Sequence, residues 1–194
     1  GANPIVGEKA AIENLNEIKS MLENNTKMVF ITAGMGGGTG TGAAPIISKL
    51  AMEMNILTVG IVTMPFVFEG KNRISQANIG LDKLRKNVDA LIVVNNNKLR
   101  DVYGNLGVKQ GFSKADEVLA TAAKGIAEVI THHYTQNIDL KDAKTVLSKS
   151  GNAIMGSAGS SGEKRAIKAV SNALDSPLLN DNSIRGAKNV LLLI

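Results

Sequence analysis

The chain has 194 residues, of which 44% are hydrophobic and 20% charged, with a formal net charge of +5 and no cysteine. This balance is ordinary for a soluble globular protein with one sizeable core, and the lack of cysteine excludes disulfide bonds and fits a reducing cytoplasm. No apolar run approaches the roughly 18 residues of a membrane-spanning helix, so we expect no direct membrane insertion. Because the lysines are scattered and only 3% of residues are aromatic, we expect no nucleic-acid partner.

The first half of the chain alternates between helical and strand-like patterns. Apolar β-branched runs predict strands, and apolar residues at helical spacing predict helices. In chain order they predict a helix at 6–22, a strand at 28–33, a helix at 44–54, a strand at 56–64, a helix at 72–87 and a strand at 90–95. Such alternation implies a Rossmann-like α/β fold, in which a parallel sheet binds ligands at the carboxyl ends of its strands.

The second half begins with a long helix, predicted over residues 112–131, whose wide apolar face is typical of a central helix. Beyond it the patterns predict a helix at 141–147, a short strand at 153–155, an amphipathic helix at 165–174 and a strand at 190–194. We therefore predict a first domain over residues 1–131 and the beginning of an α+β second domain over residues 136–194.

A glycine-rich run follows the strand at 28–33. Its glycines are Gly36, Gly37, Gly38, Gly40 and Gly42. A loop without side-chain bulk lets backbone N–H groups approach an anion, and the following helix offers the positive end of its dipole. Thr39 and Thr41 can add hydroxyl donors to phosphate oxygens, and Pro45 suits the first turn of the following helix. The run therefore predicts a phosphate-binding site.

Two common phosphate motifs can be compared with this run. Gly37 and Gly42 have the spacing of a Walker A loop, but alanines stand where that loop needs Lys and Ser or Thr, which excludes it. Gly38, Gly40 and Ala43 fit the dinucleotide fingerprint, yet the next strand ends without the acidic residue that would bind a ribose. An oxidoreductase that uses NAD(P) therefore remains an alternative.

The string GGGTGTG at residues 36–42 resembles the signature loop of the FtsZ/tubulin family of GTP-binding filament proteins. Met35 before the loop, the Ala-Ala-Pro after it and the PFVFEGK at 65–71 resemble the bacterial cell-division branch of the family rather than tubulin. Further matching segments extend the resemblance over essentially the whole chain, at 112–119, 137–142, 176–179 and 186–194.

The resemblance implies a GTPase that binds GTP or GDP with Mg²⁺ and completes its active site across a subunit contact. It implies that residues 1–131 are the GTP-binding domain, and that the protein polymerises head to tail as the scaffold of the division ring. Division-ring tethering and regulatory proteins would be further partners, and the site of action would be cytoplasmic, at mid-cell. A homologue that assembles without hydrolysing GTP remains a third hypothesis.

Four residues after the glycine loop are implied to contact the nucleotide. Glu69 and Arg73 lie four apart, and their pattern alone predicts a solvated ion pair, whereas the resemblance places them near the sugar and phosphates. Asn96 has the amide donor and acceptor that could read a guanine edge, although its two flanking asparagines depart from the usual Pro-Asn-Asp. Asp116, expected in the first turns of the long helix, would accept from guanine N1–H and the exocyclic amine.

Asn137, Asp139 and Asp142 are the catalytic candidates. By pattern alone, Asp139 reads as a helix N-cap and Asp142 as an acidic residue in the first turn. The resemblance implies instead that this loop docks against the GTP of the next subunit, where its carboxylates orient or polarise the attacking water. No metal ligands are predicted, because the adjacent His132 and His133 point in different directions and no cysteine completes a set.

The ends of the chain carry one further expectation. Family members begin with a strand and a first glycine loop that hold part of the phosphates, whereas the GANP at residues 1–4 resembles a later loop. The resemblance implies that this strand and loop, and the end of the second domain, are not among these residues. We therefore expect weak GTP binding and no measurable hydrolysis by the 194 residues alone.

Overall fold

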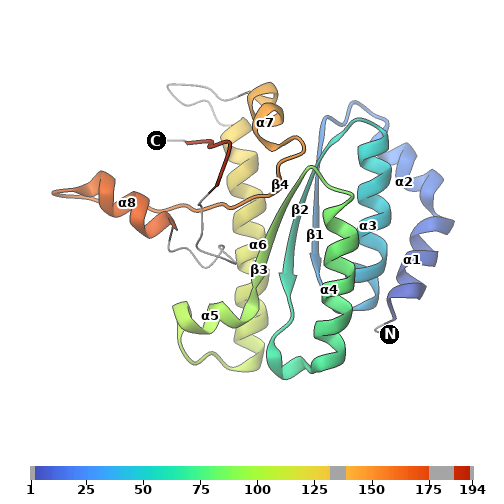
Figure 1. The fold of residues 1–194 in the computed structure, drawn as a ribbon, viewed down its shortest axis with the longest axis horizontal. Helices are drawn as coiled ribbons and strands as arrows, with labels where there is room; N and C mark the ends of the chain where they lie inside the picture. Colours follow the sequence, from blue (N-terminus) through green and yellow to red (C-terminus); the bar gives the residue numbers. More distant parts are fainter. Residues whose placement is uncertain (1–2, 132–138, 175–185, 193–194) are drawn as a thin grey trace.

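The computed structural model describes residues 3–131, 139–174 and 186–192 (Figure 1). Its elements in chain order are α1 (Pro4–Glu13), α2 (Leu15–Leu22), β1 (Met28–Gly34), α3 (Gly38–Glu53), β2 (Leu57–Met64), the 3₁₀ turn η1 (Val67–Glu69), α4 (Lys71–Arg85), β3 (Ala90–Asn95), α5 (Asn96–Tyr103), α6 (Val108–Thr131), α7 (Leu140–Leu147), β4 (Gly151–Asn152) and α8 (Arg165–Leu174).

The strands form a single parallel sheet in the order β1-β2-β3-β4. β1 pairs with β2 from Met28 opposite Leu57 to Gly34 opposite Thr63, and β3 continues the sheet on the other side of β2. Nearly every residue of β2 is buried, as expected for a parallel strand that is covered on both faces. The predicted α/β fold with a parallel sheet is confirmed.

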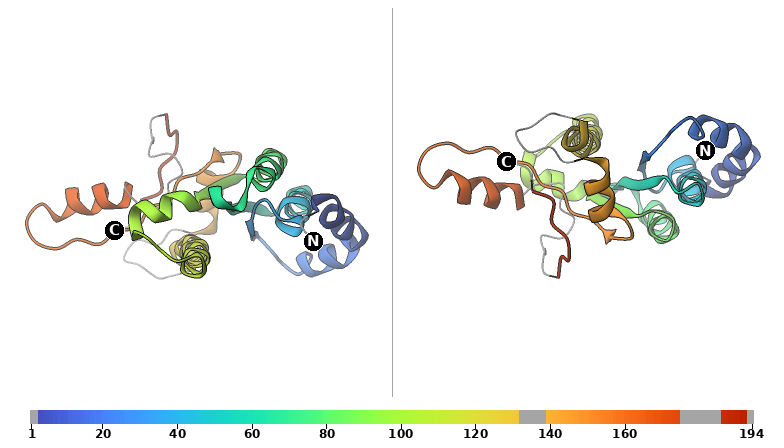
Figure 2. Two further views of the ribbon diagram at one scale, coloured as in Figure 1. Left: turned by 90° about the horizontal axis from the view of Figure 1, so that it is seen from below. Right: turned by 90° about the horizontal axis from the view of Figure 1, so that it is seen from above.

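Two apolar clusters, one on each face, hold the helices against the sheet. Ile61 points into a cluster that includes Val118 and Ala122 of α6, whereas its neighbour Val62 points into a cluster that includes Ala77 of α4. This alternation is the period of two that a strand imposes on its side chains. α6 and the α3–α4 pair therefore cover opposite faces of the sheet (Figure 2).

Several boundaries in the first half differ from the sequence predictions. The helix expected over 6–22 is interrupted at Asn14, whose side-chain amide donates to the Ala10 carbonyl at 2.8 Å and competes with the helical backbone pattern. α3 begins at Gly38 and not at Ala44, so Pro45 lies two turns inside the helix and not in its first turn. A helix that the sequence patterns do not predict, α5, follows β3 directly and is capped by the Asn95 side chain.

The second half also departs from prediction in places. α6 starts at Val108 and not at Phe112, so Asp116 lies in its third turn, beyond the reach of the helix dipole. β4 pairs at Gly151 and Asn152, just before the strand expected at 153–155. The predicted helices at 141–147 and 165–174 are confirmed by α7 and α8. The strand expected at 190–194 is wrong for residues 190–192, which are exposed and pair with no strand in the described part of the chain.

One residue at the start of β3 attaches the segment after α7 to the sheet. The Asp89 carboxylate accepts the backbone N–H of Thr58 at 3.0 Å and that of Lys149 at 3.2 Å. The Asp89 carbonyl also accepts the N–H of Gly151 at 3.0 Å. Through these bonds α7 and β4 lie at the amino ends of the strands, at the top of Figure 1.

No helix in the ranges that the structure describes is both long and apolar enough to cross a membrane.

Candidate functional site

The glycine run forms the turn between the carboxyl end of β1 and the start of α3. Gly36 has a φ of +96°, which a residue with a side chain rarely adopts, and Gly37 is the N-cap of α3 in an extended conformation. No side chain caps α3, so the N–H groups of its first turn have no side-chain acceptor at the cap. An uncapped helix N-terminus behind a glycine turn is an arrangement that binds anions.

The glycines of this loop serve different purposes. A Cβ atom added at Gly37 would meet no atom within 4 Å, so this position faces open space where a phosphate could approach. A Cβ at Gly40 would overlap the Gly34 carbonyl oxygen, and one at Gly42 would overlap the Pro4 carbonyl oxygen of α1. Gly40 and Gly42 are therefore needed for backbone packing, which brings the first turn of α1 beside the loop.

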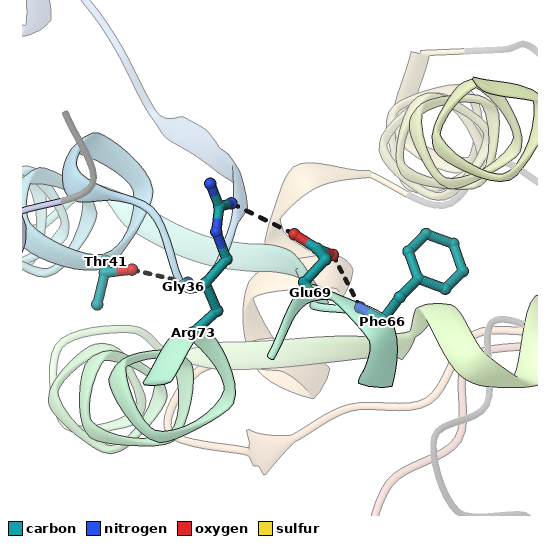
Figure 3. Close-up of polar contacts among 5 residues, drawn as sticks. All are labelled: Gly36, Thr41, Phe66, Glu69 and Arg73. Carbon is teal, nitrogen blue, oxygen red and sulfur yellow. Dashed lines mark hydrogen bonds and ion pairs between the residues drawn. The ribbon is translucent and has the colours of Figure 1, made fainter. Parts of the chain in front are cut away.

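The two threonines of the run also differ. Thr41 is only 3% exposed, and its Oγ1 accepts the Gly36 N–H at 2.8 Å, so its side chain braces the turn from within (Figure 3). Thr39 is an exposed residue in the first turn of α3. Of the two predicted hydroxyl donors to phosphate, the structure places only Thr39 where a ligand can reach it.

A second uncapped helix N-terminus, that of α4, lies beside the loop. Gly70, its N-cap, has a φ of +98° and no atom within 4 Å of an added Cβ. The loop and α4 are in close contact, because a Cβ at Gly36 would lie 2.9 Å from the Arg73 carbonyl oxygen. The positive ends of α3 and α4 therefore meet at the carboxyl edge of the sheet, toward the bottom of Figure 1.

Glu69 and Arg73 form the predicted ion pair, with Arg73 Nη1 3.3 Å from Glu69 Oε2 (Figure 3). The other carboxylate oxygen of Glu69 accepts the Phe66 N–H at 2.8 Å, and the Glu69 side chain is only 12% exposed. Arg73 is 47% exposed and reaches solvent beside Gly36. Glu69 therefore shapes its own loop, and Arg73 is the more exposed partner of the pair.

Three phenylalanines gather at the same edge. Phe66 stacks on Phe68 with 4.9 Å between ring centroids, and Phe112 meets Phe66 edge-on at 5.3 Å. Phe112 is 40% exposed and lies one helical turn before Asp116, so both side chains follow the same side of α6. Phe112 is not among the site residues that the sequence predicts, although it lies four residues before the predicted Asp116.

The first turns of α6 are also fixed to α5. Lys114 Nζ lies 2.6 Å from Glu117 Oε2 and 4.7 Å from the centroid of the Tyr103 ring. The hydrogen bond to Glu117 raises the pKa of Lys114 above its ordinary value. Since Lys114 and Glu117 both lie on α6, it is the contact with the Tyr103 ring that connects this part of α6 to α5.

Asn96 is the first residue of α5 and is 3% exposed. Its Oδ1 is buried and accepts no hydrogen bond from any residue that the structure describes. Burying an acceptor without a donor costs about 1–3 kcal/mol, which a donor on a ligand could recover. Its role in reading a guanine edge stays a prediction. Because Asn96 is 3% exposed, a ligand would have to reach below the surface to contact it.

Asp139 and Asp142 lie near the amino ends of the strands, opposite to the glycine loop. Asp142 N–H donates to Asp139 Oδ1 at 2.8 Å, and Asp139 N–H donates to Asp142 Oδ2 at 3.2 Å, so the two residues form the capping box of α7. The capping role predicted from the pattern is confirmed. The six-residue strand β3 separates these ends from the glycine loop by about 20 Å. Asn137, His132 and His133 lie outside the described residues.

The glycine loop fits a phosphate group in two respects: the free space at Gly37 and the uncapped first turn of α3. Arg73 adds a positive charge beside them. Within the described ranges no group of three or more Asp, Glu or His side chains is placed to hold a metal ion. A Mg²⁺ ion at this loop would therefore depend mainly on phosphate oxygens and water.

Comparisons with known proteins agree with this architecture. The chain is 52% identical over 192 residues to the cell division protein FtsZ of Porphyromonas gingivalis, covering 98% of this chain and 42% of that protein. It is 48% identical over 194 residues to cell division protein FtsZ 1 of Thermococcus kodakarensis, covering 100% of this chain and 52% of that protein. The chain thus spans about half the length of these curated relatives.

A solved structure titled as an empty FtsZ dimer from M. jannaschii superimposes with a TM-score of 0.86 at 47% identity, covering 92% of this chain and 52% of that one. The FtsZ family C-terminal domain matches residues 151–194. Nothing in these similarities supports the oxidoreductase alternative. The Tubulin/FtsZ family GTPase domain matches residues 1–104, which is more than half of the chain, and the protein therefore belongs to the Tubulin/FtsZ family.

Proposed function

We propose that this chain carries the nucleotide site of a GTP-hydrolysing protein that assembles head to tail and acts as a scaffold in prokaryotic cell division. The division between a GTP-binding domain over 1–131 and a second domain from 136 is part of this proposal. Both the curated relatives and the matched structure are named as cell division proteins or FtsZ.

The nucleotide lies along the carboxyl edge of the sheet. Its phosphates bind at Gly37 and the first turn of α3, with Thr39 and Arg73 as side-chain donors. Its base stacks on the exposed ring of Phe112 and donates to the Asp116 carboxylate from N1–H and the exocyclic amine. A carboxylate facing that edge favours guanine over adenine, because adenine presents an acceptor at N1.

The observation that carries the shared active site is the placement of Asp139 and Asp142. Both residues lie near the amino ends of the strands. The glycine loop lies at the carboxyl ends, about 20 Å away along β3. One subunit cannot bring this acidic pair to its own loop. A second copy stacked head to tail can, and its carboxylates then orient the water that attacks the γ-phosphate.

Such a contact joins two different surfaces of the same chain and does not close, so it produces a filament. A related structure supports self-association, since the matched M. jannaschii protein is titled a dimer. Mg²⁺ held by the phosphates, division-ring tethering proteins and a cytoplasmic location at mid-cell belong to the same proposal.

A mixing experiment tests the shared site in the full-length protein. One variant, Gly37→Ala, crowds the phosphates. The other, Asp142→Asn, removes the negative charge that is proposed to orient the attacking water. In a random mixed filament about a quarter of the contacts join an intact loop to an intact acidic pair. Turnover of the mixture above the sum of the two separate proteins is the expected result. A mixture no more active than its parts contradicts a site shared between subunits.

Nucleotide choice separates the proposed function from its alternatives. Titration calorimetry with GTP, ATP and NADH is expected to show tightest binding of GTP. Tighter binding of NADH than of GTP would favour the oxidoreductase over the GTPase. GTP binding and assembly without phosphate release would support the homologue that does not hydrolyse GTP.

A further inference from the structure

The loop after β2 carries several groups of the proposed site on a short irregular segment. Residues 65–70 contain the stacked Phe66 and Phe68 and the Glu69 carboxylate that pairs with Arg73. Within this segment the 3₁₀ turn η1 is closed by local bonds such as Glu69 N–H to the Phe66 carbonyl at 3.0 Å. Local bonds close a turn but do not fix its position relative to the sheet.

The side chain of Asn97 makes that longer connection. Its Oδ1 accepts the Val67 N–H at 2.9 Å, and its Nδ2 approaches the Pro65 carbonyl oxygen at 3.5 Å. These bonds cross from the first turn of α5 to the loop, over 30 and 32 residues of sequence. The loop after β2 is therefore tied to the helix after β3.

Asn97 is itself held in place by Asn95. The Asn95 Oδ1 accepts both the backbone N–H and the side-chain Nδ2 of Asn97, each at 3.0 Å. This acceptor orients the amide so that its oxygen faces Val67. Asn95 is the last residue of β3 and caps α5, so the loop after β2 is held in a fixed position relative to the sheet.

We propose that Asn97 is a positioning residue for the base side of the nucleotide site, a role that rests on the proposed function. Its hydrogen bonds within the described ranges go to Val67, Pro65 and Asn95, and none goes to the glycine loop or α3. The proposed phosphate donor Arg73 lies on α4, which packs directly against Gly36. Asn97 instead fixes the position of Phe68 relative to Phe112 on α6, whose ring centroid lies 6.3 Å from that of Phe68. Loss of Asn97 should therefore weaken recognition of the nucleoside and spare recognition of the phosphates.

The test compares two ligands, GTP and inorganic tripolyphosphate, by calorimetry on the full-length protein. Asn97→Ala is expected to weaken GTP binding about tenfold and tripolyphosphate binding less than about twofold. Asn97→Asp keeps an oxygen to accept the Val67 N–H but turns its second oxygen toward the Asn95 Oδ1 acceptor, so its GTP affinity should lie between those of the wild type and Asn97→Ala. Asn87→Ala, which removes a 2.8 Å bond from an asparagine amide to the Lys83 carbonyl at the other edge, is the matched control and should change neither affinity.

Hydrogen exchange at the Val67 amide checks the bracing without nucleotide. Exchange is expected to be fastest in Asn97→Ala and intermediate in Asn97→Asp, which keeps the acceptor for Val67 N–H and loses the Nδ2 donor to Asn95. Unchanged GTP affinity in Asn97→Ala, or an equal loss for both ligands, would overturn the inference while leaving the proposed function intact. A wild-type protein that binds tripolyphosphate but not GTP would refute the proposed function, and this inference with it.

Discussion

Asp139 and Asp142 each accept the other's backbone N–H, at 2.8 Å and 3.2 Å, so both carboxylates already work as a helix cap. The same groups are proposed to act on the GTP of a neighbouring subunit. A capping bond occupies one oxygen of each carboxylate, and both residues are exposed. The two roles are therefore compatible, and substitutions can separate them.

Asp142→Asn keeps an oxygen that can accept the Asp139 N–H and removes the charge, whereas Asp142→Ala removes both. We expect GTP turnover in assembled filaments to fall at least about tenfold in each variant. Only Asp142→Ala should lose stability, by about 1 kcal/mol. Turnover, filament mass and chemical denaturation on one preparation give the three values. Wild-type turnover in Asp142→Asn filaments would end the catalytic assignment.

Gly37→Ala and Gly40→Ala should fail in different ways. A Cβ at Gly37 enters open space with an extended backbone, so we expect stability within about 0.5 kcal/mol of the wild type. GTP affinity should nevertheless fall about tenfold, because the methyl group stands where a phosphate accepts an N–H. A Cβ at Gly40 overlaps the Gly34 carbonyl and should cost about 1–3 kcal/mol or more in the free energy of unfolding. Equal GTP affinity in Gly37→Ala and the wild type would count against this loop as the phosphate site.

Protein concentration should control turnover per molecule. Since the acidic pair and the glycine loop lie on opposite edges of one sheet, a dilute monomer has no complete site. We expect turnover per subunit to approach zero below the concentration at which filaments form, and to rise above it. Phosphate release measured over a dilution series, with light scattering as the assembly control, gives the result. A constant turnover per subunit would mean that the site is complete within one chain.

Asp89→Ala should release the segment after α7. The carboxylate accepts the N–H groups of Thr58 and Lys149, so its loss leaves both donors without that partner and should cost about 2–4 kcal/mol. Faster hydrogen exchange at those two amides would locate the change. Asp82→Ala is the control, because its exposed ion pair with Arg85 should be worth less than about 1 kcal/mol. Equal stability of the two variants would contradict the role of Asp89.

The parallel sheet was predictable because its signal is local: the apolar β-branched runs at 28–33 and 56–64 each form a paired strand, although only β2 is buried along nearly its whole length. The start of α3 was not predictable, because glycines predict a loop. Here helical geometry follows from tertiary packing, in which a Cβ at Gly7 would overlap the Gly38 carbonyl. The predicted position of Asp116 in the first turns of its helix was wrong because α6 starts earlier, at Val108. Glycine precedes that start, and the side chain that accepts the Gly107 N–H is Gln110, at 3.2 Å.

The candidate site was predictable at the level of its loop and less so in its details. The glycine loop, Glu69 and Arg73 were identified from the sequence, and the structure brings them together at the carboxyl ends of the strands. Thr41 could not be told from Thr39 by pattern, because only burial separates a brace from a free hydroxyl. The bracing by Asn97 depends on a contact over 30 residues, which no local pattern encodes.

The bond from Gly36 N–H to Thr41 Oγ1 joins two residues of the same loop, so it needs no phosphate to close the turn. The loop therefore has its turn built before a phosphate arrives, and little conformational entropy remains to be lost there on binding. Association at such a preorganised loop is expected to be fast and limited by encounter rather than by rearrangement. A buried threonine that touches no ligand would then govern how quickly nucleotide is captured.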